Sequence, residues 1–583
     1  MALCRGSRSL ALVVLSVALA ACGGGGGGGG SPGSGTGGTT PPPPLTPPPA
    51  YADIPQSDAE AARFLTQATF GPTRAEITRL RQIGYTRWLD EQLDPVRTPP
   101  TLILPHIQKM TAAGTLTYQE RRNYWLWQAT SARDQLRLRM GFALSQIMVV
   151  SDIDYNIRSF DRITDYQDLL DRQAFGSYRE LLEKVTLHPA MGTYLSHLAN
   201  QKAVTYKNAQ GVTVNVVPDE NYAREVMQLF SIGLVERNPD FSAKLDSAGN
   251  TIPTYTQDQV KGMAQVFTGW TWAGNTDAKY WSWAGHDNDY RPMECHPLYH
   301  EDKPKTIFRG IVIDRGSDCR ASLAQTLDAL AAHSNVAPFI SRQLIQRFVT
   351  SNPSPAYIGR VSKTWTDSNG NLGQVLRAIL LDVEARVPPA AGDAAFGKAR
   401  EPLIQLTTLW RAFDARYLPM PSGEYRFRLN NSWDFTQSLR QDSLRAPSVF
   451  NFYEPDYRLP ASGGVPGIHA PEFQLYNEAS FSSIFNQQSE GAWTSFSPTP
   501  PTANTPGPVL DSTALLARAN AGDHAGMVSL IDTLLFYGTL SPATRTTMVS
   551  MLDQLKTANR SPEECVTSLV QLAMAAPEFV VQR

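Results

Sequence analysis

The stretch Ser57-Asp-Ala-Glu-Ala-Ala-Arg-Phe-Leu-Thr-Gln-Ala-Thr-Phe-Gly71 indicates the fold class of this chain. Its first four residues have the pattern of a capping box, in which a serine hydroxyl and a glutamate carboxylate satisfy the first free amides of a helix. Apolar residues follow at helical spacing, and Gly71 suits the left-handed conformation that ends many helices. The stretch therefore predicts a short, capped helix.

The same helical signals recur along the chain. Further caps are predicted at four hydroxyl side chains, Thr73, Ser177, Thr256 and Ser561. Apolar residues at spacings of three and four fill the segments between them, as in residues 136–147 and 403–413. We expect an all-α protein that forms a single large helical body.

Strand signals are few. Residues 212–217 alternate after a turn and are predicted to form a hairpin with residues 203–206. Residues 307–313 predict another short strand. The mainly helical fold should therefore carry one or two short β-hairpins in its loops.

The N-terminal residues 1–21 have the layout of a bacterial secretory signal peptide, with arginines, an apolar run and then small residues. The run is shorter than the ~20 residues of a transmembrane helix. Its end, Leu19-Ala-Ala-Cys22, resembles the lipobox of bacterial lipoproteins. That resemblance implies that the signal is removed before Cys22 and that its thiol carries a lipid. An ordinary cleaved signal with an incidental cysteine is the alternative.

Residues 22–52 read as a disordered tether. Eight glycines, residues 23–30, give a flexible coil, and the proline-rich part that follows gives a stiffer spacer. Neither part can bury apolar surface, so neither should fold. We expect the large helical domain to span residues 53–583 and to stand off a membrane surface.

Composition narrows the function classes. The chain has 52 basic and 54 acidic side chains and a net charge of −2, which gives no basic footprint for nucleic acid. Export permits disulfides, and Cys295 and Cys319 flank one loop and are the predicted pair. Cys565 is expected to stay free and buried on a helix.

Segments along almost the whole predicted domain together carry a family resemblance. They are residues 64–73, 220–233, 267–270, 300–303 with 305–306, 348–355, 400–403, 445–452, 470–474 and 576–580. These segments resemble a bacterial family of exported proteins, DUF1800. The resemblance implies a secreted or envelope-located, mainly helical protein with no established reaction, and it makes a co-exported partner protein plausible. Some members carry a His-Asn-His motif where this chain has residues 145–150, so no metal role transfers from it.

The first candidate site is a polar helix after Asp219. Glu220, Asn221, Arg224 and Glu225 are predicted to face inward or into a cleft, because apolar residues already cover more than one side of this helix. Such a set could bind a ligand or act as a general acid and base. The alternative is a buried hydrogen-bond and salt-bridge network.

The second candidate is a loop rich in imidazoles and carboxylates. These groups suit zinc or another first-row metal, although their spacing matches no defined site. The alternative is an exposed polar loop held by the predicted disulfide. The candidate ligands of a divalent metal are His286, Asp287, Asp289, His296, His300 and Asp302.

The third candidate is aromatic. Exposed tryptophans near carboxylates and amides are what sugar-binding clefts use, because a flat ring face stacks on a pyranose. Trp281 and Trp283, with Lys303, are the candidate ligand-binding residues. The same aromatic cluster contains Trp270 and Trp272, and the alternative is that these two end a core helix and simply pack.

Two function classes remain open. The favoured one is a lipid-anchored envelope protein, at the outer membrane or cell surface, that binds or assembles an extracellular polymer with a co-exported partner. The other is a hydrolase or lyase acting on an extracellular polysaccharide, with a divalent metal as its possible cofactor. Signatures of serine hydrolases, zinc proteases and nucleotide-binding proteins are absent from the sequence.

Overall fold

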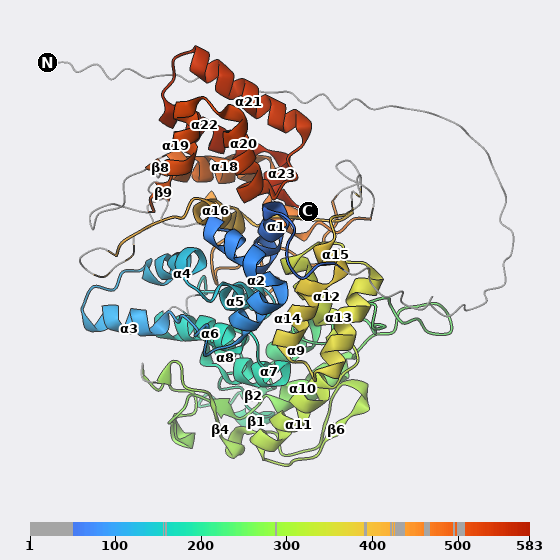
Figure 1. The fold of residues 1–583 in the computed structure, drawn as a ribbon. Coiled ribbons are helices and arrows are strands. Elements are labelled where there is room, and N and C mark those ends of the chain that lie inside the picture. Colours follow the sequence, from blue (N-terminus) through green and yellow to red (C-terminus); the bar gives the residue numbers. More distant parts are fainter. Residues whose placement is uncertain are drawn as a thin grey trace. The chain divides into compact units, whose positions relative to one another are not determined.

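The computed structural model describes residues 51–154, 157, 160–285, 288–389, 393, 395–419, 423, 425, 438–459, 467–493, 496–497 and 508–583. Residues Pro48–Arg583 form one compact unit in which helices predominate (Figure 1). The prediction of a mainly helical body is confirmed.

The helices of the first part follow one another with short connections as far as α8, and longer segments precede α9 and α10. In chain order they are α1 Asp58–Ala68, α2 Arg74–Leu93, α3 Leu104–Ala112, α4 Glu120–Ser131, α5 Gln135–Ser145, α6 Phe160–Gln173, α7 Tyr178–Leu187, α8 Pro189–Tyr194, α9 Asn221–Gln228 and α10 Gln257–Val266.

The second part continues the pattern after an irregular segment. Its α-helices are α11 Cys319–Ala331, α12 Val336–Phe348, α13 Pro355–Asp367, α14 Leu372–Leu381, α15 Val383–Arg386, α16 Pro402–Ala412, α18 Glu478–Trp493, α19 Thr513–Ala521, α20 His524–Ile531, α21 Pro542–Thr557, α22 Pro562–Ala575 and α23 Pro577–Val580. Short 3₁₀ or π segments are η2 Asp277–Lys279, η4 Pro297–Tyr299, η5 Phe308–Gly310, η6 Pro471–Leu475 and η7 Asp532–Phe536.

Strands occur as two-stranded sheets in the described residues. The predicted hairpin is confirmed, because β1 Val204–Lys207 pairs antiparallel with β2 Thr213–Val216. The remaining pairs are β3 Trp270–Thr271 with β4 Glu294–Cys295, β5 Lys305–Thr306 with β6 Val312–Ile313, β7 Lys398–Ala399 with β10 Val581–Gln582, and β8 Phe496–Ser497 with β9 Leu510–Asp511.

The prediction of one strand over residues 307–313 is wrong. The chain turns there through η5, with Arg309 at a φ of 53°, and its two ends pair with each other as β5 and β6. An alternating apolar pattern is shared by a strand and by a tight turn between two short strands, so periodicity alone cannot separate them.

Helix caps follow the predicted hydroxyls at four of five positions. Thr256 and Ser561 form complete capping boxes with the side chains three residues later. Ser57 and Thr73 accept the expected backbone N–H, but their glutamates bind elsewhere. Ser177 makes no side-chain cap hydrogen bond, so that prediction is wrong.

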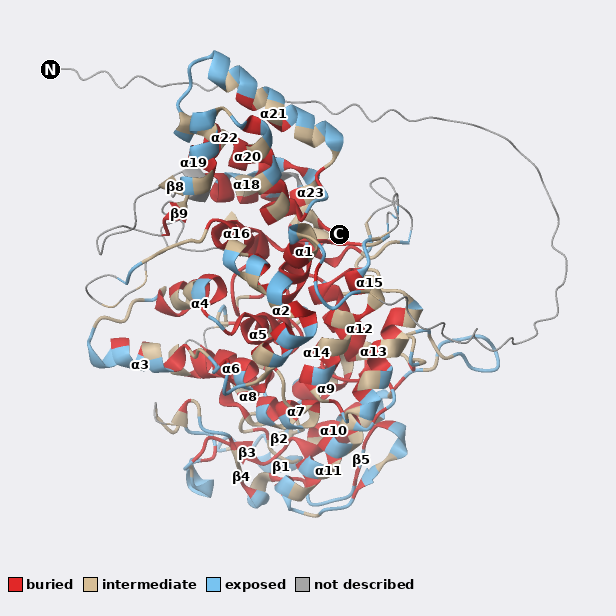
Figure 2. Cartoon of the chain, in the orientation of Figure 1, coloured by how far each residue is buried: buried red, intermediate tan, exposed pale blue. Residues whose placement is uncertain are grey.

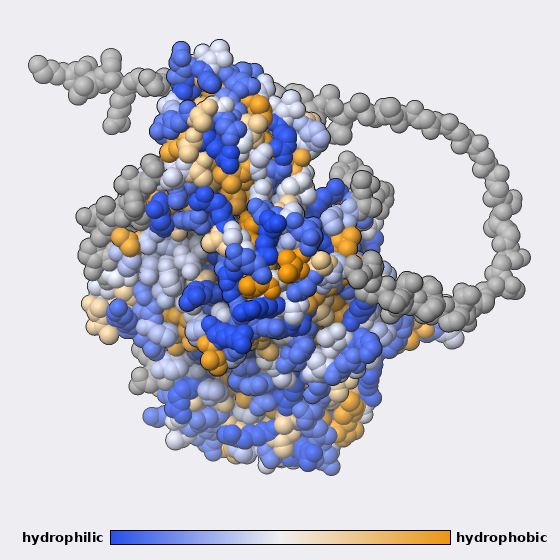
Figure 3. Space-filling model, viewed as in Figure 1, coloured by the Kyte–Doolittle hydropathy of each residue, from blue (hydrophilic) through white to orange (hydrophobic). Residues whose placement is uncertain are grey.

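The core runs through the body and lies on the inner faces of the helices. Figure 2 shows buried residues along α5 and α16 and exposed ones along α21. On the face drawn in Figure 3, hydrophilic residues predominate and hydrophobic ones lie among them. None of the helices in the described part of the chain has the length and apolar character needed to cross a bilayer.

The beginning and the end of the body are joined directly. Arg63 on α1 donates from Nε to the carbonyl oxygen of Arg583, at 3.2 Å, and from Nη1 to that of Arg386, at 3.0 Å. Pairing of β7 with β10 adds a second connection. Contacts of this kind, far apart in sequence, close the helices into one unit.

Candidate functional site

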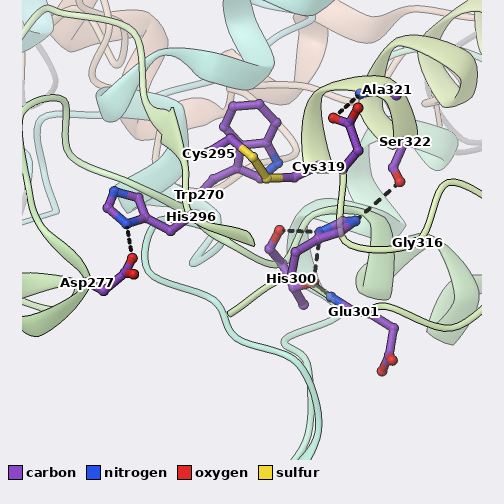
Figure 4. The surroundings of a disulfide bond; sticks show 12 residues. Trp270, Asp277, Cys295, His296, His300, Glu301, Gly316, Cys319, Ala321 and Ser322 are labelled. Carbon is purple, nitrogen blue, oxygen red and sulfur yellow. Dashed lines mark hydrogen bonds and ion pairs between the residues drawn. A yellow bond between two sulfur atoms is a disulfide. The ribbon is translucent and has the colours of Figure 1, made fainter. Parts of the chain in front are cut away.

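A disulfide braces the segment that carried two of the predicted sites. We call residues 270–319 the aromatic loop. Cys295 on β4 is paired across the sheet with Trp270 on β3 and is bonded to Cys319, the first residue of α11, with their Cα atoms 6.0 Å apart (Figure 4). The bond ties the middle of the loop to the start of a core helix. The free Cys565 is buried, as expected.

Aromatic side chains occupy both the interior and the surface of the aromatic loop. Tyr280 is buried, and its hydroxyl donates to the carbonyl oxygen of Asn200 at 2.7 Å. Its ring stacks on Tyr299 with centroids 3.9 Å apart. Trp281 packs edge-on against Tyr299, 4.9 Å between centroids, yet stays 58% exposed. The inner rings therefore support an outer tryptophan.

The second exposed tryptophan is oriented by a buried ion pair. Trp283 is 52% exposed, and its indole Nε1 donates to Asp289 at 3.1 Å. Asp289 is buried and pairs with Arg162 of α6 at 2.5 Å. The Arg162 guanidinium also lies over the Trp272 ring, 4.6 Å from its centroid. Trp270 and Trp272 are buried, which agrees with the packing alternative for these two residues.

The predicted metal ligands within the described residues do not converge. Asp289 is engaged by Arg162, and His296 by Asp277 at 2.6 Å. Asp302 is exposed, as is Lys303. No group of three or more histidine, cysteine, aspartate or glutamate side chains that could hold a metal occurs in the part of the chain that the structure describes, and His286 and Asp287 lie outside it.

His300 is used as a buried structural group. Its Nδ1 donates to the carbonyl oxygen of Thr268 at 2.8 Å, and its Nε2 accepts from the Ser322 hydroxyl at 3.2 Å. Burial lowers the pKa of His300 to about 4, so the ring is neutral near pH 7. Figure 4 shows His296 and His300 directed to different partners.

An exposed hairpin adjoins the aromatic loop. The Lys202 amide, two residues before β1, donates to the carbonyl oxygen of Tyr299 at 2.8 Å. Apolar side chains on and beside the hairpin face solvent: Val204, Tyr206, Val212 and Val217. The hairpin and the segment that carries the exposed tryptophans are thus joined through their backbones, and both expose apolar side chains.

The polar helix α9 is divided between surface and core, which corrects the inward-facing prediction. Asn221 is exposed. Glu220 and Arg224 are half-buried and pair at 3.2 Å, and both bind Gln257 at the start of α10. Glu225 alone is buried, at 6% exposure. The inward-facing prediction is confirmed for Glu225, is wrong for Asn221, and is met only in part by Glu220 and Arg224.

Glu225 is the chemically unusual member of this set. Its Oε2 is buried without a hydrogen-bond partner, and burial raises the pKa of its carboxyl group, against an opposing effect of Arg224. A carboxyl group of this kind can carry a proton nearer neutral pH than a surface glutamate. An acid–base pair would need a second titratable side chain beside Glu225. The candidates His300 and Asp289 do not provide it, because His300 is bonded to Thr268 and Ser322 and Asp289 is paired with Arg162.

The supporting residues of the aromatic loop were not foreseen. Arg162, which fixes Asp289, lies 127 residues before it in the chain, and Tyr299 reads from sequence as one aromatic among many. A cluster of tyrosine and tryptophan shortly before Cys295 was the available signal. It indicates an aromatic loop but not which rings are buried.

Comparison with known proteins gives one family. Residues 63–581 match the family described as "Protein of unknown function (DUF1800)". No curated protein and no solved structure matches the chain.

Proposed function

The chain belongs to the DUF1800 family, and on that premise we propose that it is a non-catalytic binding protein of the cell envelope. It holds an extracellular polysaccharide on the aromatic loop and acts with a co-exported partner protein. The observation that carries this proposal is the pair of exposed tryptophans, Trp281 and Trp283, supported by buried side chains.

The two exposed indole rings leave apolar surface in contact with water, and a bound ligand would cover it. A tryptophan that keeps more than half of its surface in water gains little from folding. Here both rings are held in place, Trp281 by Tyr299 and Trp283 by Asp289, so each presents a fixed face to solvent. A sugar ring stacked on such a face buries apolar surface at little cost in side-chain entropy.

The partner would bind at the neighbouring hairpin. Among the strands that the structure describes, β1 and β2 pair with no third strand, so each offers there an edge able to accept a further strand. The exposed valines and Tyr206 add apolar contact area. Because the hairpin lies next to the aromatic loop, a partner bound there would be close to a polysaccharide held on the loop.

A lipid anchor at Cys22 would hold this binding surface at the envelope. The support is the lipobox-like sequence and the glycine- and proline-rich tether. Both lie outside the described residues, and the proposal for them rests on sequence. An outer-membrane or surface position suits a protein that holds an extracellular polymer.

The catalytic alternative, a hydrolase or lyase, has weaker support. It would require Glu225 to meet His300 or Asp302, but these side chains differ in their surroundings. Glu225 is buried on α9, His300 is bonded to Thr268 and Ser322, and Asp302 is exposed. Binding needs only the aromatic surface.

The test is retention on a panel of immobilised neutral and acidic polysaccharides. We expect at least one to retain the protein without being shortened. Trp281→Ala and Trp283→Ala should each weaken retention by tenfold or more, about 1.4 kcal/mol, as for aromatic residues at binding hot spots. Tyr118→Ala, at another exposed aromatic side chain, is the matched control and should bind normally. Equal retention of all three variants would refute the proposal, and release of shortened chains would favour the enzyme.

A further inference from the structure

A cavity lies in another part of the molecule from the aromatic loop. Its volume is about 350 Å³, which is within the range of small-molecule sites. It is formed where the end of α9 and the segment after it meet α12 and residues 449–456. Residues from two of the segments that carry the family resemblance, 220–233 and 445–452, line it together.

Two buried side chains in its wall have donors without partners. Arg347 is 2% exposed; its Nη1 and Nη2 donate to the carbonyl oxygens of Gln343 and Gln146, at 3.1 and 3.0 Å, and its Nε has no partner. Asn451 is 6% exposed, and its Nδ2 has none either. Buried donors normally find acceptors, so these two indicate an acceptor supplied from the cavity.

The backbone at Asn451 is itself unusual. Its φ is 65°, in the left-handed region, where residues other than glycine are uncommon and asparagine is among the better tolerated. Such conformations concentrate at ligand sites, where a side chain must be aimed in one direction. At this position the side chain is that of Asn451, which carries the amide donor Nδ2.

Three arginines and two carboxylates line the cavity: Arg237, Arg342 and Arg347 with the exposed Glu454 and Asp456. The guanidinium groups of Arg237 and Arg342 lie over the same ring, that of Phe241, at 4.3 and 4.6 Å from its centroid. Arg342 pairs with Asp456 at 2.8 Å, but that carboxylate is 67% exposed. The arginine is therefore buried while its counter-ion is in water, where the attraction between them is screened.

The charged groups behind the wall are already paired. Lys398 lies 3.1 Å from Glu472 and 3.9 Å from Glu401, and it also donates to the carbonyl oxygen of Arg347 at 2.9 Å. These carboxylates are engaged with a cation, and Glu401 also accepts from Gln146 and Gln441. The same two carboxylates oppose the charge of Arg347, so Arg237 and Arg342 supply the further positive charge beside the cavity.

We propose that this cavity binds a small organic anion, with a carboxylate, sulfate or phosphate group on a ring-shaped or apolar body. The anionic group accepts hydrogen bonds from Arg347 Nε and Asn451 Nδ2, and Arg342 supplies the nearest further charge. The body of the ligand lies against Phe241 and Phe450, which also line the cavity. This site is separate from the aromatic loop and does not depend on polysaccharide binding there.

The experiment is calorimetric titration of the full-length protein with benzoate and phenyl phosphate, and with benzamide as the neutral analogue of benzoate. We expect the anions to bind at least tenfold more tightly than benzamide, and more weakly as salt is raised. Binding of benzamide equal to that of benzoate, or no binding by any of the three compounds, would overturn the proposal. In the second case the donors are satisfied by water alone.

Two variants with opposite expected effects make the assignment specific. Asn451→Asp removes the donor and adds a negative charge, while aspartate tolerates the left-handed backbone, so benzoate binding should fall at least tenfold. Asp456→Asn removes the competing carboxylate from Arg342 and should raise affinity about threefold or more. Asp414→Asn, which frees the surface arginine Arg74 in the same way, is the matched control and should change nothing. Unchanged affinity in Asp456→Asn, a surface change that should not impair folding, would contradict the site.

Discussion

Two arginines in the core of this protein donate to backbone carbonyl groups at the ends of distant segments. Arg400 bonds the carbonyl oxygens of Phe579 and Leu535, at 3.1 and 3.0 Å. Arg411 bonds those of Gly71 and Thr130, at 2.6 and 2.8 Å. Carbonyls at helix ends lack partners within the helix, and the several donors of one guanidinium can satisfy two at once. Sequence reading places arginines at the surface, so it could not foresee these connections.

The first prediction at the residue scale concerns Arg224. It forms a half-exposed cluster with Glu220 and Gln257, so Arg224→Ala should cost no more than about 1 kcal/mol of unfolding free energy. Urea unfolding of the variant beside the parent protein checks this. A loss of several kcal/mol would mean that the pair is buried after all, and Arg81→Ala, at another surface ion pair, shows the size of an ordinary loss.

The second prediction concerns the buried carboxyl group of Glu225. Because burial raises its pKa above the value of 4.5 for a free glutamate, the folded state binds its proton more tightly than the unfolded state does. The resulting stability is fully present below about pH 4.5 and is lost as the pH rises through the higher pKa of the folded state. Glu225→Gln removes that loss, so the variant should gain stability relative to the parent as the pH rises from 4.5 to 8.

The measurement is urea unfolding of both proteins at several pH values across that range. Glu183→Gln, at a partly exposed glutamate on α7 that pairs with Arg179, controls for a general effect of one charge. A difference between parent and Glu225→Gln that stays constant with pH would show that this carboxyl group does not titrate there.

At the scale of the element, the sequence predicted those features that depend on neighbouring residues alone, such as turns and helix caps. The hairpin β1–β2 was found because its turn and its alternation are both local signals. The capping boxes at Thr256 and Ser561 were found for the same reason. The predicted cap at Ser177 is not formed. The backbone of Ser177 instead pairs in an isolated bridge with Asn371, which lies far along the chain. A tertiary contact of this kind leaves no local pattern to read.

The aromatic loop shows the same limit for the site. Its tryptophans and its cysteine pair could be named from sequence, since each is a property of one segment. The partners of Asp289 and of His300 could not be, because Arg162 on α6 and Ser322 on α11 come from other elements. Residues that resembled metal ligands are thus held as ion pairs and hydrogen bonds.

The prediction for this element is that the disulfide supports the loop more than the body. Replacing both Cys295 and Cys319 by alanine opens a loop of 24 residues, for which chain-entropy reasoning gives about 3 kcal/mol. We expect a lower melting temperature, helical circular dichroism unchanged at 25 °C, and weaker polysaccharide retention. Cys565→Ala is the control and should retain polysaccharide normally. Normal retention by the double variant would show that the loop keeps its shape without the bond.

At the scale of the whole molecule, the composition of the chain distinguishes a helical body from a segment that is predicted not to fold. Residues 22–52 contain almost no apolar side chains to bury, whereas the body encloses a continuous core from Ala61 to Phe579. A binding body on a long unfolded tether can reach a polymer over a wide volume while its anchor stays fixed. Anchor, tether and binding surface therefore form one consistent design under the proposed function.

The last prediction concerns that anchor. If Cys22 carries a lipid, the protein should partition with membranes because acyl chains bury methylene groups in the bilayer, each contributing about 0.8 kcal/mol. Cys22→Ser removes the attachment point and should give an unprocessed or soluble species. Cys4→Ser is the matched control: its cysteine lies in the segment predicted to be removed, so the variant should fractionate like the parent. Membrane fractionation with mass spectrometry of the mature N-terminus distinguishes these outcomes. A Cys22→Ser protein that is cleaved and still sediments with membranes would rule out the lipid and leave the attachment to the folded body or its partner.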